Sequence, residues 1–122
     1  MIDAKSIKAP AEAAIDTATL AVLIRSGAPL VVLDARSGHY DDGRRIPGAK
    51  NLPVKSTASE VESVVGSNDA FIITYCSNLH CPASKALYGH LKNLGYENVL
   101  EYPDGIAGWV APGYPVEERA GA

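Results

Sequence analysis

The chain has 122 residues, of which 47% are hydrophobic, which suits one domain with a buried core and is too short for two. Its formal net charge of -3 argues against a nucleic-acid partner, and no apolar run is long enough to cross a membrane. Residues 1–12 lack the continuous apolar core of a signal peptide, so we expect a cytoplasmic protein. The whole chain, residues 1–122, is therefore expected to form one domain.

The amino-terminal part predicts a helix between two strands. Residues 6–9 are expected to form a short edge strand. Asp16 then matches a helix N-cap, leucine and isoleucine recur on one helical face, and Gly27 closes the helix. Residues 30–33 are apolar throughout and Asp34 follows them, which is typical of a strand buried inside a parallel sheet.

The next segment is rich in turn-forming and charged residues. A helical turn is expected over residues 37–42, with Tyr40 packed inward. Arg44 and Arg45 follow in a loop, where we expect both to be solvated. A short third strand is predicted at residues 49–53.

A second helix is indicated between this strand and the centre of the chain. Ser59 and Glu62 match a capping box, and valines recur at helical spacing after them. A glycine, a serine, an asparagine and an aspartate at residues 66–69 then form a turn.

Residues 70–85 are the stretch on which we expect the functional site. Residues 71–75 indicate a second fully buried strand, and Cys76 follows it directly. Pro82 fits the first position of a helix that ends near Gly95. Cys76 is thus expected to face a helix N-terminus across a short loop, where open parallel sheets bind ligands. Orphan amides and the helix dipole favour an anion there, so Cys76 is predicted to be a nucleophile.

The carboxyl-terminal residues complete a layered pattern. Residues 99–102 predict a last strand, and a turn leads from it into a short helix that contains Trp109. Residues 112–116 are expected to form an extended tail. Buried strands separated by helices imply crossover connections. We therefore predict a three-layer α/β/α fold around a central, mostly parallel sheet of about five strands.

Several short motifs, taken in their order and spacing, resemble the rhodanese-like domain family. Leu33–Arg36 is similar to the family's Asp-x-Arg strand end, and Ile46–Ala49 resembles its Gly-His-Ile-Pro-Gly-Ala block, with Arg45 in place of the usual histidine. Tyr75–Cys76 matches the end of the active-site strand, and further motifs match between residues 95 and 116. The resemblance covers nearly the whole chain and implies a rhodanese-like fold.

This resemblance implies sulfur transfer through a persulfide. In the family, a cysteine thiolate takes a sulfane sulfur from a donor, holds it on a loop of backbone amides and passes it to a thiol or cyanide. On this chain Cys76 is the implied carrier. The implied cradle is made by the loop residues Ser77, Asn78, Leu79, His80 and Cys81. We expect no cofactor and no metal, a small-molecule or protein sulfur donor, and a thiol acceptor; the oligomeric state is left open.

The loop departs from the family pattern. It contains neither the usual glycine nor the usual arginine, and it is about two residues longer than usual. His80, Lys85 and Arg44–Arg45 are the candidates to replace the missing arginine in binding an anionic donor, so thiosulfate as a donor stays open. Asp34 and Arg36, at the preceding strand end, are interpreted as a structural ion pair that supports the site.

Cys81 admits three interpretations. It can be a resolving thiol that attacks a Cys76 persulfide or sulfenate and forms an internal disulfide. It can bind a metal with Cys76 and His80, although this spacing suits zinc poorly. It can also be a small residue packed under the loop. His80 itself either stabilises the thiolate or is an ordinary exposed side chain.

We therefore predict a sulfurtransferase, with two alternatives. The first is a thiol redox protein that uses the Cys76 and Cys81 pair. The second is a non-catalytic rhodanese-like regulatory or docking module. A phosphatase or arsenate reductase is disfavoured, because Pro82 stands where a Cys-x5-Arg loop needs its arginine.

Overall fold

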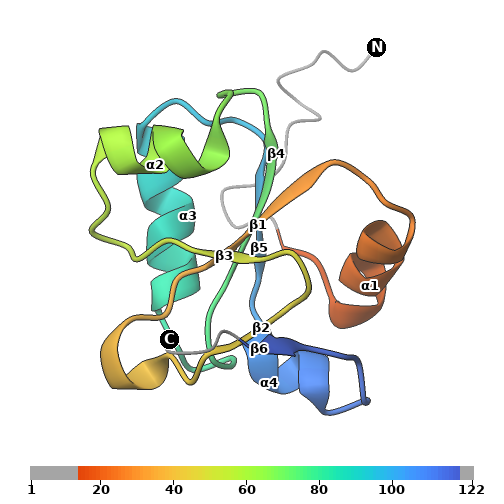
Figure 1. Cartoon of the computed structure of the whole chain (residues 1–122). Helices are drawn as coiled ribbons and strands as arrows, with labels where there is room; N and C mark the ends of the chain where they lie inside the picture. Colours follow the sequence, from red (N-terminus) through yellow and green to blue (C-terminus); the bar gives the residue numbers. More distant parts are fainter. Residues whose placement is uncertain (1–13, 119–122) are drawn as a thin grey trace.

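The computed structural model describes residues 14–118, so the edge strand predicted at residues 6–9 lies outside the described residues. Helices and strands follow one another along the chain as drawn in Figure 1. The elements are α1 (Thr17–Arg25), β1 (Leu30–Asp34), a 3-10 turn η1 (Gly38–Tyr40), β2 (Arg44–Arg45), β3 (Lys50–Asn51), α2 (Ala58–Val65), β4 (Phe71–Tyr75), α3 (Ala83–Asn93), β5 (Val99–Tyr102), α4 (Gly105–Val110) and β6 (Glu117–Glu118).

Four parallel strands form the central sheet, in the order β3-β1-β4-β5. The last residues of β1 and β4, Asp34 and Tyr75, lie opposite each other, so the two strands end at the same edge. Ala14 adds an isolated parallel bridge to Glu101 of β5. The predicted parallel α/β fold is confirmed, with four strands in the sheet over residues 14–118 where about five were expected.

Helices cover both faces of this sheet. Figure 1 shows α2 and α3 on one face and α1 and α4 on the other. Leu33 and Ile72 pack with α2 and α3, whereas Val32 and Ile73 pack with α1 and α4. Neighbouring residues of one strand therefore enter different apolar layers, which explains why both central strands are apolar throughout. None of the helices described in residues 14–118 is long and apolar enough to span a membrane.

The helix starts follow from local capping. Asp16 caps α1 as predicted. The capping box of α2 consists of Thr57 and Glu60, so the prediction of Ser59 and Glu62 was wrong. The N-cap lies two residues before the predicted one, because Thr57 and Glu60 exchange both side chain–backbone hydrogen bonds of the capping box.

The carboxyl-terminal tail is fastened to α4 and to β2. Trp109 Nε1 donates a hydrogen bond to the carbonyl of Pro115 at 2.7 Å, and its ring stacks on that of Tyr114 at 4.8 Å between centroids. The tail then forms β6, which pairs antiparallel with β2, so that Arg45 lies opposite Glu117. Trp109 therefore packs against the tail, and the β2–β6 pair was not predicted.

Candidate functional site

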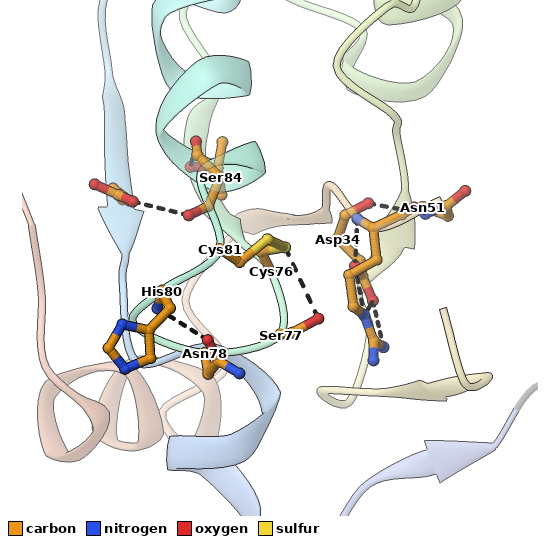
Figure 2. The surroundings of a disulfide bond; sticks show 11 residues. Asp34, Asn51, Cys76, Ser77, Asn78, His80, Cys81 and Ser84 are labelled. Atoms are coloured by element: carbon orange, nitrogen blue, oxygen red, sulfur yellow. Dashed lines mark hydrogen bonds and ion pairs between the residues drawn. A yellow bond between two sulfur atoms is a disulfide. The ribbon is translucent and has the colours of Figure 1, made fainter. Parts of the chain in front are cut away.

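Cys76 directly follows β4, at the edge where the central strands end, and only 2% of its surface is exposed. Its sulfur is joined to that of Cys81 in a disulfide, with the two Cα atoms 6.2 Å apart (Figure 2). This separation lies in the usual range for disulfides. The structure therefore shows the oxidised form of the loop, in which neither cysteine is a free thiol.

A turn around Asn78 brings Cys81 back toward Cys76. The Cys81 amide donates to the Asn78 carbonyl at 3.1 Å, and the His80 amide donates to Asn78 Oδ1 at 2.9 Å. Two of the amides expected to cradle a persulfide are therefore engaged by Asn78 in this oxidised loop. Ser77 Oγ lies 4.0 Å from Cys76 Sγ.

The beginning of the loop is held by the first turn of α4. The Ile106 amide donates to the Cys76 carbonyl, and the Ala107 amide donates to the Ser77 carbonyl, each at 3.0 Å. Gly105 has φ of +66°, and a Cβ on it would stand 2.5 Å from the Cys76 carbonyl oxygen. Only glycine allows this close approach without strain.

The end of the loop is held by the first residues of α3. The Thr74 hydroxyl donates to the Ser84 carbonyl at 2.9 Å, and the Ser84 hydroxyl donates to Glu101 Oε2 at 2.8 Å. Helix α3 begins at Ala83, with Pro82 in the N-cap position, one residue later than predicted. Both ends of the loop are thus tied to the sheet or to α4, so the two cysteines are held on a short, anchored segment.

Asp34 and Arg36 form the predicted ion pair. Both are buried, and the Arg36 Nη2 group donates to Asp34 Oδ2 at 2.7 Å while Nε donates to both carboxylate oxygens at 3.0 Å. Arg36 also donates to Asp42 Oδ1 at 3.0 Å. Asn51 donates to the carbonyls of Asp34 and Arg36 and so fixes the chain where it leaves β1 (Figure 2).

Arg45 belongs to the same buried network, so the prediction that both loop arginines are solvated was wrong for Arg45. Its side chain is 4% exposed, and it donates to both oxygens of Asp41, at 2.6 and 2.9 Å. It also lies 3.3 Å from Asp34 Oδ2. The reason is that pairing of β2 with β6 holds the segment around Arg45 against the fold. The carboxylates of three aspartates then offset the cost of burying the guanidinium groups of Arg36 and Arg45. Arg44, in contrast, is half-exposed and pairs with Asp42.

These contacts predict a loss of stability in acid. The hydrogen bonds from Arg45 lower the pKa of Asp41. Burial acts to raise the pKa of Asp42, but hydrogen bonds from Arg44 and the charge of Arg36 bring it down to about 2. Because both folded-state values lie below the unfolded value, the stabilisation is present above that value and is lost as pH falls from about 4 to about 2.

The measurement is the midpoint of urea unfolding between pH 6 and about pH 2, for the wild type and for Asp41→Asn combined with Asp42→Asn. The double variant should be less stable at neutral pH and should lose less stability in acid. An equal acid response of both proteins would contradict the role given to these two carboxylates.

A pocket of about 500 Å³ opens beside the disulfide. Its walls come from the end of β1, η1, the loop and the start of α3: Ala35, Arg36, Ser37, Tyr40, Cys76, Ser77, Asn78, His80, Cys81, Pro82 and Ala83. Tyr40 is 65% exposed at this pocket, so its predicted inward packing was wrong. The 3-10 turn directs the ring to the surface instead of to the core.

The basic residues considered as replacements for the missing loop arginine lie in different places relative to the pocket. Arg36 lines it, but the Arg36 guanidinium is bound to Asp34 and Asp42. His80 lines it too, although Figure 2 shows the His80 ring pointing away from the disulfide. Arg45 and Lys85 are not among its lining residues; Lys85 is exposed on the first turn of α3. Leu79 is 67% exposed and borders a separate hollow next to α4.

Within residues 14–118, no group of three or more His, Cys, Asp or Glu side chains is placed to hold a metal ion. Cys76 and Cys81 form a disulfide instead of the metal site considered for them with His80. The His80 ring points away from this disulfide (Figure 2).

Comparison with known protein families matches most of the described chain. A family model described as the rhodanese-like domain matches residues 16–112. The chain belongs to this family. The matched range includes β1, the loop with both cysteines, and α4, so the resemblance inferred from the short motifs is confirmed.

Solved structures agree on the fold. The BH2092 protein from Bacillus halodurans is 26% identical, with a TM-score of 0.78 over 88% of this chain and 77% of that one. The rhodanese-like domain of the Alr3790 protein from Anabaena is 24% identical, with a TM-score of 0.75 over 88% of this chain and 80% of that one. A thiosulfate sulfurtransferase from Pseudomonas aeruginosa is 23% identical, with a TM-score of 0.70 over 88% of this chain and 20% of that one.

One curated relative has a different description. The HTH-type transcriptional regulator Rv0324 of Mycobacterium tuberculosis is 29% identical over 107 residues. The match covers 86% of this chain but 46% of the regulator, so the chain spans about half the length of the relative that it resembles.

Sequence reasoning missed several residues that build the site. Asp41 and Asp42 pair with the two buried arginines, and the two aspartates followed closely by two arginines at positions 41–45 were the available signal. The role of Gly105 depends on a contact between α4 and the Cys76 loop, and nothing in the local sequence indicates that contact.

Proposed function

We propose that this rhodanese-like domain is a sulfurtransferase in which reduced Cys76 carries a sulfane sulfur. The observation that supports the proposal most is the place of Cys76, at the carboxyl end of β4 and in the wall of a pocket. Family members act through a cysteine at this strand end. Ligands of open parallel sheets bind at this edge as well.

The proposed reaction has two displacements. The Cys76 thiolate attacks the outer sulfur of the donor, the donor's sulfur–sulfur bond breaks, and the remainder of the donor leaves with the electron pair. A thiolate acceptor then attacks the outer sulfur of the Cys76 persulfide, and Cys76 leaves as a thiolate. Because the disulfide blocks the first step, the oxidised loop must be reduced before the first cycle can begin.

The pocket favours a weakly charged sulfur donor. Alanine, proline and tyrosine side chains make up much of its wall. The guanidinium of Arg36 already serves two carboxylates, so it offers little charge to a second anion. Thiosulfate carries two negative charges and would have to leave water without a matching cation. We therefore propose a low-molecular-weight or protein persulfide as the donor.

The test compares donors on the reduced protein. Sulfur transfer to a small thiol is followed with a low-molecular-weight persulfide and with thiosulfate, each under the same reductant. We expect kcat/KM to be at least about tenfold higher for the persulfide, which corresponds to about 1.4 kcal/mol of transition-state stabilisation. Equal or faster turnover of thiosulfate would contradict the proposed donor, and turnover of neither would remove the proposed activity.

The disulfide favours a thiol redox protein as the second candidate function. A cysteine pair that closes within a short loop can exchange disulfides with other proteins without carrying sulfur. This redox protein would reduce a model protein disulfide and would gain no sulfur from any donor. A domain that does neither would be a regulatory module, as the match to a transcriptional regulator suggests.

A further inference from the structure

We infer that Cys81 resolves the Cys76 persulfide and releases its outer sulfur as sulfide, leaving the Cys76–Cys81 disulfide. The inference rests on the proposed persulfide at Cys76 and adds to it a product, sulfide, and a second substrate class, a dithiol reductant. The domain would then reduce sulfane sulfur in addition to handing it to an acceptor.

The folded loop already places the two sulfur atoms in bonding contact. The turn around Asn78 returns the chain to Cys76, and the Cα atoms of the two cysteines are 6.2 Å apart. Contacts from α4 at one end and from β4 and β5 at the other keep this segment in place. Attack by Cys81 is therefore intramolecular and needs no unfolding, which raises its effective concentration far above that of a free thiol.

The disulfide also shows which sulfur of a Cys76 persulfide Cys81 can reach. It joins the Cys81 sulfur to Cys76 Sγ, which is the inner sulfur of a Cys76 persulfide. Attack on the inner sulfur expels the outer one as sulfide. Attack on the outer sulfur would only move it to Cys81, whereas attack on the inner sulfur forms the Cys76–Cys81 bond directly.

Atoms and electrons balance in this step. The Cys81 thiol loses its proton to solvent and its thiolate attacks Cys76 Sγ. The bond between Cys76 Sγ and the outer sulfur breaks, and hydrosulfide leaves with the electron pair. The sulfane sulfur is reduced to sulfide while the two cysteines are oxidised to the disulfide.

A dithiol must then regenerate the loop. Cys76 is almost fully buried, whereas Cys81 is partly exposed, so we expect an incoming thiolate to attack the Cys81 sulfur. Cys76 leaves as a thiolate, ready for the next donor, and the second thiol of the reductant releases Cys81 from the mixed disulfide.

The experiment is a single turnover without external reductant. Reduced, desalted wild type, Cys81→Ser and Cys81→Ala are each mixed with one equivalent of a low-molecular-weight persulfide and desalted again at once. Intact mass and trapped sulfide are then followed over time. Circular dichroism checks that the variants are folded, and the alanine variant controls for the serine hydroxyl.

The wild type should first gain one sulfur atom, then lose it and two hydrogens, with about one equivalent of sulfide released. Both Cys81 variants should keep the extra sulfur and release sulfide at least about tenfold more slowly. A wild-type persulfide that lasts as long as that of the variants would overturn the inference while leaving the proposed sulfur transfer intact. No gain of sulfur in any of the three proteins would overturn both.

Discussion

Cys76→Ser is expected to lower sulfur transfer to the rate of the uncatalysed reaction between donor and acceptor, a loss of at least about a thousandfold. A serine hydroxyl is a far weaker nucleophile than a thiolate at neutral pH, and it cannot form a persulfide that leaves again. The measurement is kcat/KM for sulfur transfer from a low-molecular-weight persulfide to a small thiol, with the protein kept reduced.

Cys81→Ser is the matched control for this result. Both variants lose the same disulfide and the same sulfur contact in the loop, and they differ in which thiol remains. Cys81→Ser should retain transfer to the small thiol within about tenfold of the wild type. Equal losses in the two variants would contradict the assignment of Cys76 as the carrier and would favour a redox pair in which both cysteines are required.

Gly105→Ala is expected to lower the free energy of unfolding by at least about 3 kcal/mol. Part of the loss, about 1–2 kcal/mol, comes from holding alanine at a positive φ. The larger part comes from collision, because the new Cβ would stand 2.5 Å from the Cys76 carbonyl oxygen and 2.8 Å from the Ser77 carbonyl carbon. Backbone atoms cannot turn aside as a flexible side chain can, so α4 must move away from the loop.

Gly27→Ala separates the two contributions. Gly27 also has a positive φ, +75° against +66° at Gly105, but a Cβ there meets nothing within 4 Å. This variant should lose only about 1–2 kcal/mol. Urea unfolding of both variants under identical redox conditions provides the comparison. Equal destabilisation of the two variants would contradict the close contact between Gly105 and the backbone of the Cys76 loop.

The Gly105 contact has a functional consequence as well. The Ile106 and Ala107 amides donate to the carbonyls of Cys76 and Ser77, so displacement of α4 releases the start of the loop. Gly105→Ala should therefore also slow sulfur transfer at temperatures where the variant is still folded. Gly27 lies just before the start of β1, at the opposite end of the strands from the loop, so Gly27→Ala should leave transfer unchanged.

The fold could be predicted because its signals are local. The apolar runs at residues 30–33 and 71–75 contribute to two apolar layers, one on each face of the sheet, which is why they are apolar throughout. Cys76 was identified for the same reason, since a residue that directly follows a buried parallel strand must lie at the edge where sites are built.

The parts that could not be predicted depend on contacts between distant segments. Arg45 is buried because β6, some 70 residues later, pairs with β2, and a local reading of two adjacent arginines favours solvent. Tyr40 faces the pocket because of the geometry of a three-residue turn. The sequence shows that the loop lacks the usual arginine. Only the structure shows that Arg36 is already paired with two aspartates.

The measurement that tests the central claim most directly is the intact mass of reduced Cys81→Ser after brief exposure to a low-molecular-weight persulfide. The chain contains two cysteines, so this variant has Cys76 as its only thiol. We predict the gain of one sulfur atom, which is lost again when a small thiol is added. An unchanged mass, under conditions in which the same donor modifies a small thiol, would contradict the assignment of Cys76 as a sulfur carrier.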